Sequence, residues 1–243
     1  MIQTNFQDSE QKPILQSQLL KGEAGIDHYC SMRAFVNPGA GVWMPRQVHG
    51  TEIVVVDDTT PFDETQELQP VDADAVITQQ TGRWIGVRTA DCVPVLLYDP
   101  MTRTVAAVHA GWRGTVRHIV RLVVEKMQSQ LGVNPENLRA MIGPSICADS
   151  FEVGEEVATE FVAAGRGDCV QRLALGTNGS RIAYPKPHVD LWQSNVMDLL
   201  EAGIPLDQVD CTPLCTFLND DVLFSARRQG IATGRIVTAI CLK

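Results

Sequence analysis

Two short apolar runs, CVPVLLYD at residues 92–99 and TVAAVHA at residues 104–110, follow each other closely in the sequence. Both are rich in Val and Leu, and a proline in the segment between them fixes φ early in a turn. This pattern predicts a β-hairpin. Antiparallel counting across the turn places Cys92 opposite His109, to within two residues. Because directly opposed residues have Cβ atoms about 5 Å apart, these two side chains can reach one metal ion or one substrate.

The charge balance of the chain limits its partners. The 243 residues carry a formal net charge of −9, whereas nucleic acids and anionic membrane surfaces attract basic faces. We therefore expect a small-molecule substrate, and neither a nucleic acid nor a membrane as partner. No apolar run approaches the roughly 20 residues that cross a bilayer, and the polar start lacks the basic and apolar regions of a signal peptide. The chain is accordingly predicted to be cytoplasmic.

The cysteines do not suggest a disulfide framework. They are odd in number and irregularly spaced, so most are predicted to be small buried hydrophobic residues. Cys211 and Cys215 have a CxxxC spacing that a metal could use, but no second pair or nearby His completes a four-ligand structural site. The seven cysteines are Cys30, Cys92, Cys147, Cys169, Cys211, Cys215 and Cys241.

Helical periodicity begins after the hairpin. Apolar residues at helical spacing predict one amphipathic helix over residues 114–131, which Gly132 ends. Two further helices are predicted over residues 153–164 and 189–203. The final segment, residues 222–243, is predicted to form two strands joined by a Gly-containing turn.

Strands dominate the chain up to Ala110 and are interleaved with helices after it. This order indicates an α/β or α+β fold with a mixed sheet, and the hairpins argue against a purely parallel sheet. The sequence has no internal repeat and no convincing domain boundary. One domain is therefore predicted over residues 1–243, in which residues 1–30 are a weakly patterned N-terminal segment.

Three residues, His49, Cys92 and His109, each lie at a predicted strand end beside Gly or another small residue. One Cys and two His are good ligands for Zn²⁺ and leave a fourth position for water, which is the pattern of a catalytic zinc site. The same set also suits copper. On spacing alone two other interpretations stay open. Cys92 could be a nucleophile with His109 as its base and Asp91 or the other His as orienting group, or it could be a buried core thiol.

Asp91 and Arg113 flank these candidates. Asp91 is predicted to accept an imidazole N–H and Arg113 to bind phosphate or carboxylate, although either could form a surface ion pair instead. Arg113 also lies in the turn that opens the predicted long helix, whose first N–H groups attract anions. Asp72 and Asp74 could face a cleft, but they are predicted to solvate a strand edge instead, and His118 is predicted to lie on the helix surface.

Nine short motifs occur in order from about Ser31 to the C-terminus: QVHGTEI, DADAVIT, TADCVPVLL, VAAVHAGWRG, IGPSI, FEVGEEV, LCT, FSARR and TGR. On these motifs, above all TADC followed by HAGWRG, the chain is identified as a member of the polyphenol oxidase or laccase-domain family, also called the YfiH family. The resemblance implies a single α/β/β/α sandwich with mixed sheets. It also implies a metal site formed by His49, Cys92 and His109.

Members of this family are described as purine nucleoside phosphorylases that also deaminate adenosine and split methylthioadenosine, with zinc in the site. An older description is a copper-dependent polyphenol oxidase, and related proteins are described as editing factors in peptidoglycan synthesis. The resemblance therefore implies a nucleoside and phosphate as substrates of a monomer or homodimer. It implies Gln47 and Arg33 as substrate-binding residues beside Arg113, and Asp91 as a catalytic residue beside the three metal ligands.

The sequence departs from the family pattern in two places. Only residues 34–45 connect the Ser31-Met32-Arg33 element to QVHG, where the family usually has a longer segment. Either this wall of the site is missing or the sequence omits a stretch, so the substrate selectivity stays open. The FSARR motif lacks the aromatic residue that usually precedes the two arginines, although Arg227 and Arg228 are retained.

The leading hypothesis is a zinc-dependent purine nucleoside phosphorylase that acts on adenosine, inosine and methylthioadenosine, deaminates adenosine, and holds phosphate at Arg113. The alternatives are a metal-independent cysteine hydrolase that cleaves an amide in a peptidoglycan precursor, a copper-dependent polyphenol oxidase, and a metal-stabilised interaction module without enzymatic activity. A four-copper laccase is excluded, because such enzymes use many closely spaced His and this chain has 5 in total.

Overall fold

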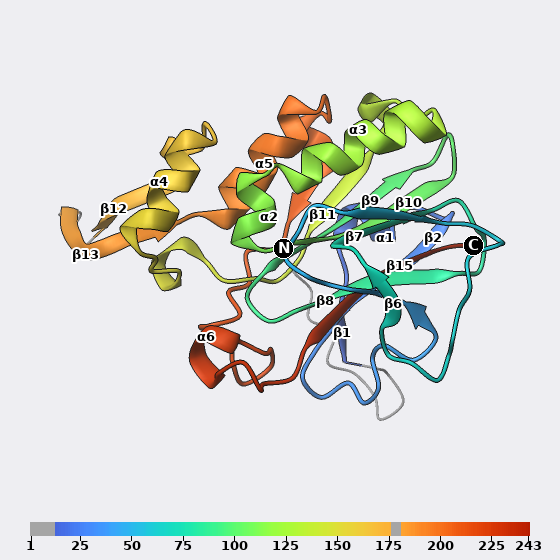
Figure 1. The fold of residues 1–243 in the computed structure, drawn as a ribbon, viewed down its shortest axis with the longest axis horizontal. Helices are drawn as coiled ribbons and strands as arrows, with labels where there is room; N and C mark the ends of the chain where they lie inside the picture. The colour runs from blue at the N-terminus through green and yellow to red at the C-terminus, as the bar shows by residue number, and fades with distance from the viewer. Residues whose placement is uncertain (1–12, 176–180) are drawn as a thin grey trace.

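The computed structural model describes residues 13–175 and 181–243, and most of its strands form two stacked sheets (Figure 1). The six-stranded sheet has the order β14 (Val209–Cys211), β11 (Arg139–Ile142), β9 (Val93–Asp99), β10 (Thr104–Ala110), β7 (Ala75–Thr78) and β5 (Ile53–Val56). The five-stranded sheet has the order β1 (Ile14–Leu15), β2 (Ile26–Ser31), β15 (Ile236–Leu242), β8 (Trp84–Thr89) and β3 (Val42–Trp43). Two further pairs join β4 (Pro45–Arg46) to β6 (Gln69–Asp72) and β12 (Val170–Leu175) to β13 (Arg181–Val189).

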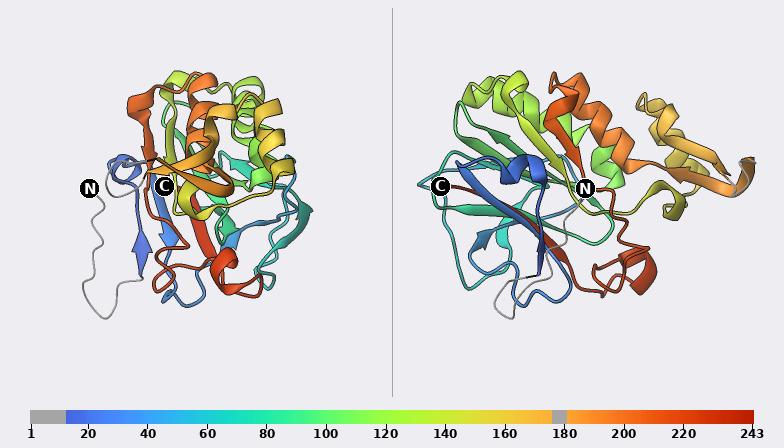
Figure 2. Two further views of the ribbon diagram at one scale, coloured as in Figure 1. Left: turned by 90° about the vertical axis from the view of Figure 1, so that its left-hand side faces the viewer. Right: turned by 180° about the vertical axis from the view of Figure 1, so that it is seen from behind.

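The helices gather mainly on one side of these sheets. They are α1 (Gln18–Lys21), α2 (Trp112–Val116), α3 (Ile119–Leu131), α4 (Glu155–Ala163), α5 (Leu191–Glu201) and α6 (Ala226–Gln229). Helices α3 and α5 lie side by side over the outer face of the six-stranded sheet, and α4 extends to one side together with β12 and β13 (Figures 1 and 2). The helices predicted over residues 153–164 and 189–203 are therefore confirmed. None of the described helices combines the length and the apolar character needed to cross a bilayer.

Strands β9 and β10 form the predicted hairpin. Their register pairs Asp99 with Thr104 and Pro94 with His109, and Cys92 immediately precedes β9. The expected closeness of Cys92 and His109 is thus confirmed to within two residues. Every residue of both strands is buried, because they lie at the centre of the sheet and are covered on both faces.

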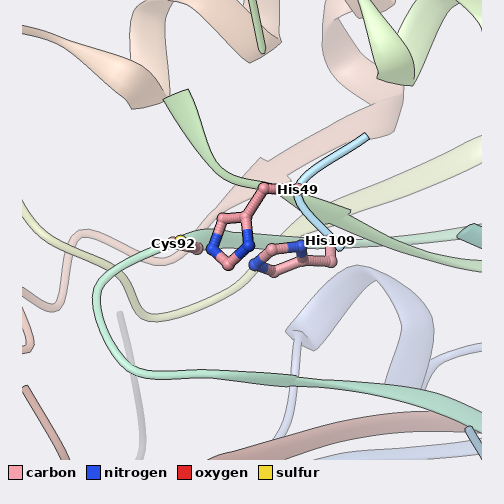
Figure 3. A group of neighbouring side chains, drawn as sticks. All are labelled: His49, Cys92 and His109. Atoms are coloured by element: carbon pink, nitrogen blue, oxygen red, sulfur yellow. The ribbon is translucent and has the colours of Figure 1, made fainter. Parts of the chain in front are cut away.

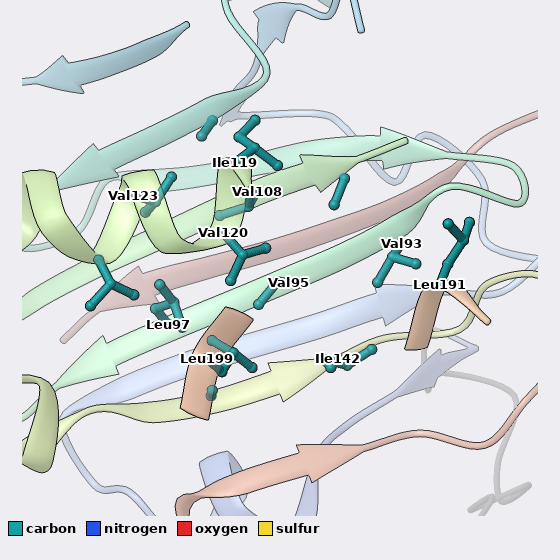
Figure 4. Close-up of a cluster of buried hydrophobic side chains, with 14 of the residues drawn as sticks. Val93, Val95, Leu97, Val108, Ile119, Val120, Val123, Ile142, Leu191 and Leu199 are labelled. Carbon is teal, nitrogen blue, oxygen red and sulfur yellow. The ribbon is translucent and has the colours of Figure 1, made fainter. Parts of the chain in front are cut away.

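The two faces of β9 belong to two different parts of the core. Val95 and Leu97 belong to the cluster beneath α3 and α5 (Figure 4), whereas Leu96 and Tyr98 pack toward the five-stranded sheet. This alternation follows from the period of two residues in a strand. Full burial of such a side chain contributes about 1.5–3 kcal/mol, so packing on both faces makes the hairpin a rigid support for the residues at its open end.

The helix predicted over residues 114–131 is wrong in one respect, because the chain forms two helices there. His118 separates α2 from α3 and has a left-handed backbone with φ of 58°. Its Nδ1 lies 2.9 Å from a carboxylate oxygen of the buried Asp198 on α5. His118 is therefore not the helix-surface residue that was predicted, since a buried acid holds it at the break. Gly132, with φ of 70°, ends α3 as expected.

The prediction for residues 222–243 is half wrong. The second predicted strand is present as β15, but the first is replaced by turns and the short helix α6. The Ser225 hydroxyl accepts a hydrogen bond from the backbone N–H of Arg228 at 3.2 Å, and the Asp91 carboxylate accepts one from the N–H of Arg227 at 2.6 Å. Side chains thus satisfy the backbone groups that a strand would have paired.

The expected fold class is confirmed. Both large sheets are mixed, because parallel pairs such as β5 with β7 and β3 with β8 accompany antiparallel ones. The face between the sheets is apolar, and the ends of β8, β9 and β10 open on the region where the candidate site lies.

Candidate metal centre

The three predicted ligands lie together at the open end of the hairpin. His49 comes from the loop after β4, Cys92 from the turn between β8 and β9, and His109 from β10. One donor atom from each residue lies within 4.8 Å of the others. Figure 3 shows the two imidazoles and the thiol converging on one point, with the rings edge to face and their centroids 4.9 Å apart.

The buried Asp74 organises this cluster. Its carboxylate accepts hydrogen bonds from three consecutive backbone N–H groups, those of Val48 at 3.2 Å, His49 at 3.0 Å and Gly50 at 2.7 Å. The loop is thereby wrapped around the acid, and His49 takes a left-handed backbone with φ of 59°. The same carboxylate lies 2.8 Å from Nδ1 of His109. Asp74 is therefore not the solvated edge residue that was predicted.

Asp74 also fixes which nitrogen of His109 faces the site. An ionised carboxylate only accepts hydrogen bonds, so Nδ1 carries a proton and Nε2 is the nitrogen that faces the site, where its lone pair becomes available to a metal once that nitrogen is deprotonated. Such an Asp–His contact is the usual support of a metal-bound imidazole. Asp74 was missed because DADAV reads as an alternating edge pattern; its neighbour Asp72 is exposed and pairs with Arg46.

Gly111 leaves the space that the cluster occupies. A Cβ atom at this position would lie 3.0 Å from Cδ2 of His49 and 3.2 Å from Sγ of Cys92. Both distances are shorter than ordinary van der Waals contact, so a side chain here would displace the ligand candidates. The glycine of the HAGWRG motif is thus explained by steric exclusion at the site.

The charges within the cluster are coupled. Burial alone would raise the pKa of the Cys92 thiol, but the charge of His109 and hydrogen bonds from both imidazoles outweigh it and lower the pKa to about 6. Burial alone would lower the pKa of His109, but the Cys92 thiolate and Asp74 outweigh it and raise the pKa to about 9. In the same way the pKa of Asp74 is lowered by His109 and by the Gly50 and Val48 N–H groups, in spite of its burial. A thiolate is therefore favoured at Cys92.

These residues fit a bound metal ion. The thiolate and two imidazoles are ligands that zinc and copper both accept, the Asp74 contact orients one imidazole, and Gly111 keeps the centre clear. The set supplies three protein ligands and opens on a cavity. This is the arrangement of a catalytic metal site rather than a closed structural one.

The cluster faces a cavity of about 540 Å³. Gln47 lines it and is held against β8, since its amide donates to the carbonyl of Arg88 and accepts from the N–H of Arg88, both at 2.8 Å. Three arginines, Arg88, Arg227 and Arg235, also line the cavity. Two of them lie in quoted motifs, FSARR and TGR, which is the signal that could have identified them from the sequence.

Asp91 lines the cavity but does not contact either imidazole in the way that was predicted. Its carboxylate accepts the hydroxyl of Thr216 at 2.7 Å and the N–H of Arg227 at 2.6 Å, and its backbone has φ of 90°. The imidazole acceptor is Asp74 instead. Asp91, the residue before Cys92, thus connects the turn that carries Cys92 to the C-terminal segment.

Arg33 and Arg113 are not among the described residues that line the cavity. Arg33 donates to the carbonyl oxygens of Asp220 and Leu223 at 2.8 and 2.7 Å. Its guanidinium group also stacks on the ring of Phe224. Arg113 is exposed and lies over the ring of Trp112, 4.4 Å from its centroid. Arg113 lies within α2, which has only 5 residues, so the long helix expected to begin there begins only at Ile119, as α3. Substrate binding by these two arginines stays a prediction.

Comparisons with known proteins agree on one family. The family model described as "Multi-copper polyphenol oxidoreductase laccase" matches residues 28–243. A protein of Bacteroides thetaiotaomicron named purine nucleoside phosphorylase is 40% identical over 201 residues, which cover 82% of this chain and 72% of that protein. A protein of an unknown prokaryotic organism named adenosine deaminase RL5 is 41% identical over 205 residues, covering 82% of this chain and 74% of that protein.

The fold is also similar to solved structures. The crystal structure of the Bacillus licheniformis hypothetical protein YfiH superposes with a TM-score of 0.74 at 27% identity. The match covers 84% of this chain and 75% of that one.

Proposed function

The chain belongs to the multi-copper polyphenol oxidoreductase laccase family, and on that premise we propose that it is a metal-dependent purine nucleoside phosphorylase that also deaminates adenosine. Relatives at 40 and 41% identity carry the names of these two activities. The observation that carries the proposal is the position of the His49–Cys92–His109 cluster, which opens directly on an arginine-lined cavity.

We assign zinc to the three ligands His49, Cys92 and His109, where it would supply a Lewis acid. The protein's own contribution is to hold the donors ready. Asp74 keeps the proton of His109 on Nδ1, and the low pKa of Cys92 keeps its sulfur as the thiolate that a metal requires.

Phosphate is the second substrate of a phosphorylase, and the arginines of the cavity provide its recognition. Guanidinium groups bind phosphate through paired charge-assisted hydrogen bonds. The guanidinium carbon Cζ of Arg227 lies 5.2 Å from the ring centroid of Phe151. One guanidinium nitrogen donates to the carbonyl of Glu152, which leaves further N–H groups for an anion. In phosphorolysis an oxygen of this phosphate would form the bond to ribose C1′ as the bond from C1′ to the purine base breaks. The cavity arginines therefore replace Arg113 as our proposed phosphate ligands.

The test is product analysis with protein of known metal content. Inosine with phosphate is expected to give hypoxanthine and ribose 1-phosphate, and adenosine without phosphate is expected to give inosine. Both reactions should fall when the metal is removed and return when zinc is added. Zinc-loaded, folded protein that forms neither product, or metal-free protein that forms them equally fast, would contradict the proposal.

One observation favours a second candidate, the metal-independent cysteine hydrolase. Cys92 and His109 form a thiolate and imidazolium pair with shifted pKa values, which is also the activated state of a cysteine nucleophile. A covalent adduct on Cys92, trapped with an amide of a cell-wall precursor, would support it. Zinc bound stoichiometrically to the same sulfur would exclude it.

A further inference from the structure

Two cysteines lie together outside the metal centre. Cys147 follows β11 and Cys215 follows β14. The backbone N–H of Cys147 donates to Sγ of Cys215 at 3.2 Å, and the Cys147 thiol is also oriented as a donor toward that sulfur. The hydroxyl oxygen of Ser150 lies 3.4 Å from Sγ of Cys147 and 3.8 Å from Sγ of Cys215. Both sulfurs therefore share one small polar environment.

The backbone around this pair is held in place. Ser145 and Cys215 form a parallel bridge, in which Ser145 donates to the carbonyl of Leu214 and accepts from the N–H of Thr216. Since the amide nitrogen is about 1.5 Å from its Cα, the Cα of Cys147 lies within about 4.7 Å of the Cys215 sulfur. Because the Cα of Cys215 lies two bonds, about 2.8 Å, beyond this sulfur, the two Cα atoms are at most about 7.5 Å apart, a range that includes the Cα separations of about 4.4–6.8 Å across disulfides.

We propose that Cys147 and Cys215 are a redox pair that hydrogen peroxide oxidises to a reversible disulfide. The proposal concerns a site separate from the metal centre and does not depend on the nucleoside chemistry. It also departs from the reading of the CxxxC spacing as a metal pair, because Cys215 is partnered by Cys147 rather than by Cys211.

The reaction balances with peroxide as the oxidant. The Cys215 thiolate attacks one peroxide oxygen, the O–O bond breaks, and the other oxygen leaves as water once it is protonated, so that a sulfenic acid forms. The Cys147 thiol then attacks this sulfur, the S–S bond forms as the S–O bond breaks, and a second water leaves. Two thiols lose two electrons and one peroxide gains them.

The surroundings of the pair favour this sequence. Hydrogen bonds from the Cys147 thiol lower the pKa of Cys215 in spite of its burial, helped by the backbone N–H groups of Cys147 and Leu218. Cys215 therefore carries the thiolate, which is the reactive form. Cys147 is partly exposed, so a small oxidant can approach the pair.

Hydrogen bonds also connect the segments of this cysteine pair to the wall of the cavity. Ile146 lines the cavity, and its N–H donates to the carbonyl of Asp91 at 3.0 Å. The hydroxyl of Thr216 donates to the Asp91 carboxylate at 2.7 Å. A disulfide between Cys147 and Cys215 would therefore join the two segments that hold the residue before Cys92.

The experiment maps the thiols of the native protein after treatment with hydrogen peroxide. Remaining thiols are blocked with iodoacetamide, and the protein is digested without reductant for mass spectrometry. We expect a linked peptide containing Cys147 and Cys215, lighter than the sum of its parts by two hydrogen atoms, which dithiothreitol separates. In Cys147→Ser this peptide should be absent and Cys215 should be trapped by dimedone as the sulfenic acid.

The matched control is Cys169→Ser. Cys169 is buried and lies 3.8 Å from the sulfur of Met197, so its loss should leave the linked peptide unchanged. The proposal is overturned if Cys147 and Cys215 both remain open to alkylation under conditions that oxidise Cys92, or if either is found linked to a different cysteine. The mapping of the unmutated protein decides the question even where a variant folds poorly.

Discussion

The Asp74 carboxylate accepts a hydrogen bond from Nδ1 of His109 at 2.8 Å and from the backbone N–H of His49 at 3.0 Å. One buried acid therefore sets the positions of two of the three metal-ligand candidates. It orients one imidazole through its ring and the other through its backbone. The loop that carries His49 and the strand that carries His109 are thus joined by a single side chain.

Replacing Asp74 by Asn should weaken metal binding. The amide is neutral and offers one acceptor oxygen instead of two, so the loop and the His109 ring cannot both be held as before. Loss of such an outer contact typically lowers metal affinity roughly 10–100-fold. Competition against a chelator of known zinc affinity measures the change. Asp72→Asn is the control, because Asp72 is exposed, and equal affinities for the two variants would refute the role of Asp74.

Gly111→Ala should disturb the centre by steric exclusion. The added methyl carbon would lie 3.0 Å from His49 and 3.2 Å from the Cys92 sulfur, so the donors must move apart. We expect zinc affinity to fall roughly tenfold or more while the far-ultraviolet circular dichroism stays unchanged. Gly22→Ala is the matched control, since Gly22 has φ of −70° and its added atom would lie 3.5 Å from the nearest atom. Unchanged affinity in Gly111→Ala would show that the site tolerates the methyl group.

The hairpin and the ligand cluster were predictable because both follow from local rules. A tight turn fixes antiparallel register, and this register determines which residues meet at the open end. Cys92 and His109 were placed in this way, whereas His49 comes from a separate loop: its strand-end position made it a candidate, and the family motif assigned it to the same ligand set. The role of Asp74 could not be predicted, because burial of an acid depends on what packs over it, and that information is tertiary.

The break at His118 and the arginine-lined cavity could not be predicted from the sequence either, because both depend on tertiary contacts. Helical periodicity continues through His118, but a carboxylate from α5, about 80 residues further along the chain, holds this residue in a left-handed conformation. Arg88 lies on β8, whereas Arg227 and Arg235 lie far along the chain, in α6 and directly before β15, and the pairing of β15 with β8 brings Arg235 beside Arg88. Motifs gave two of these positions without showing that they face the metal ligands.

The free energy of unfolding should fall in mild acid because the buried His28 takes up a proton more readily in the unfolded chain. Burial lowers the pKa of this imidazole to about 4, against an ordinary value of 6.5, and its Nε2 accepts the N–H of Ser17 at 3.0 Å. The unfolded chain therefore binds the proton more readily than the folded one. The neutral His28 therefore contributes to the free energy of unfolding. This contribution is fully present above about pH 6.5 and is lost as the pH falls toward 4, by up to about 3 kcal/mol.

Urea unfolding at pH 7 and pH 5 checks the effect of His28. In His28→Gln, which retains a side-chain acceptor but does not titrate, the loss of stability between these values should be smaller than in the unmutated protein. His118→Gln serves as a comparison at a histidine whose imidazole contacts a carboxylate rather than a backbone donor. If His28→Gln loses as much stability as the unmutated protein over this range, then His28 does not cause the acid sensitivity.

Arg227→Gln should reveal where phosphate binds. Arg227 lines the cavity beside the metal ligands, and loss of a charge-assisted hydrogen bond to phosphate removes about 1.5–3 kcal/mol, or roughly a 10- to 100-fold rise in the KM for phosphate. The deamination of adenosine, which needs no phosphate, should change much less. Arg228→Gln is the matched control, because the neighbouring Arg228 pairs with Asp220 at 3.0 Å outside the described lining of the cavity. Arg113→Gln distinguishes the two assignments: a rise in KM for that variant alone would return phosphate to the exposed Arg113 on α2 and remove it from the cavity.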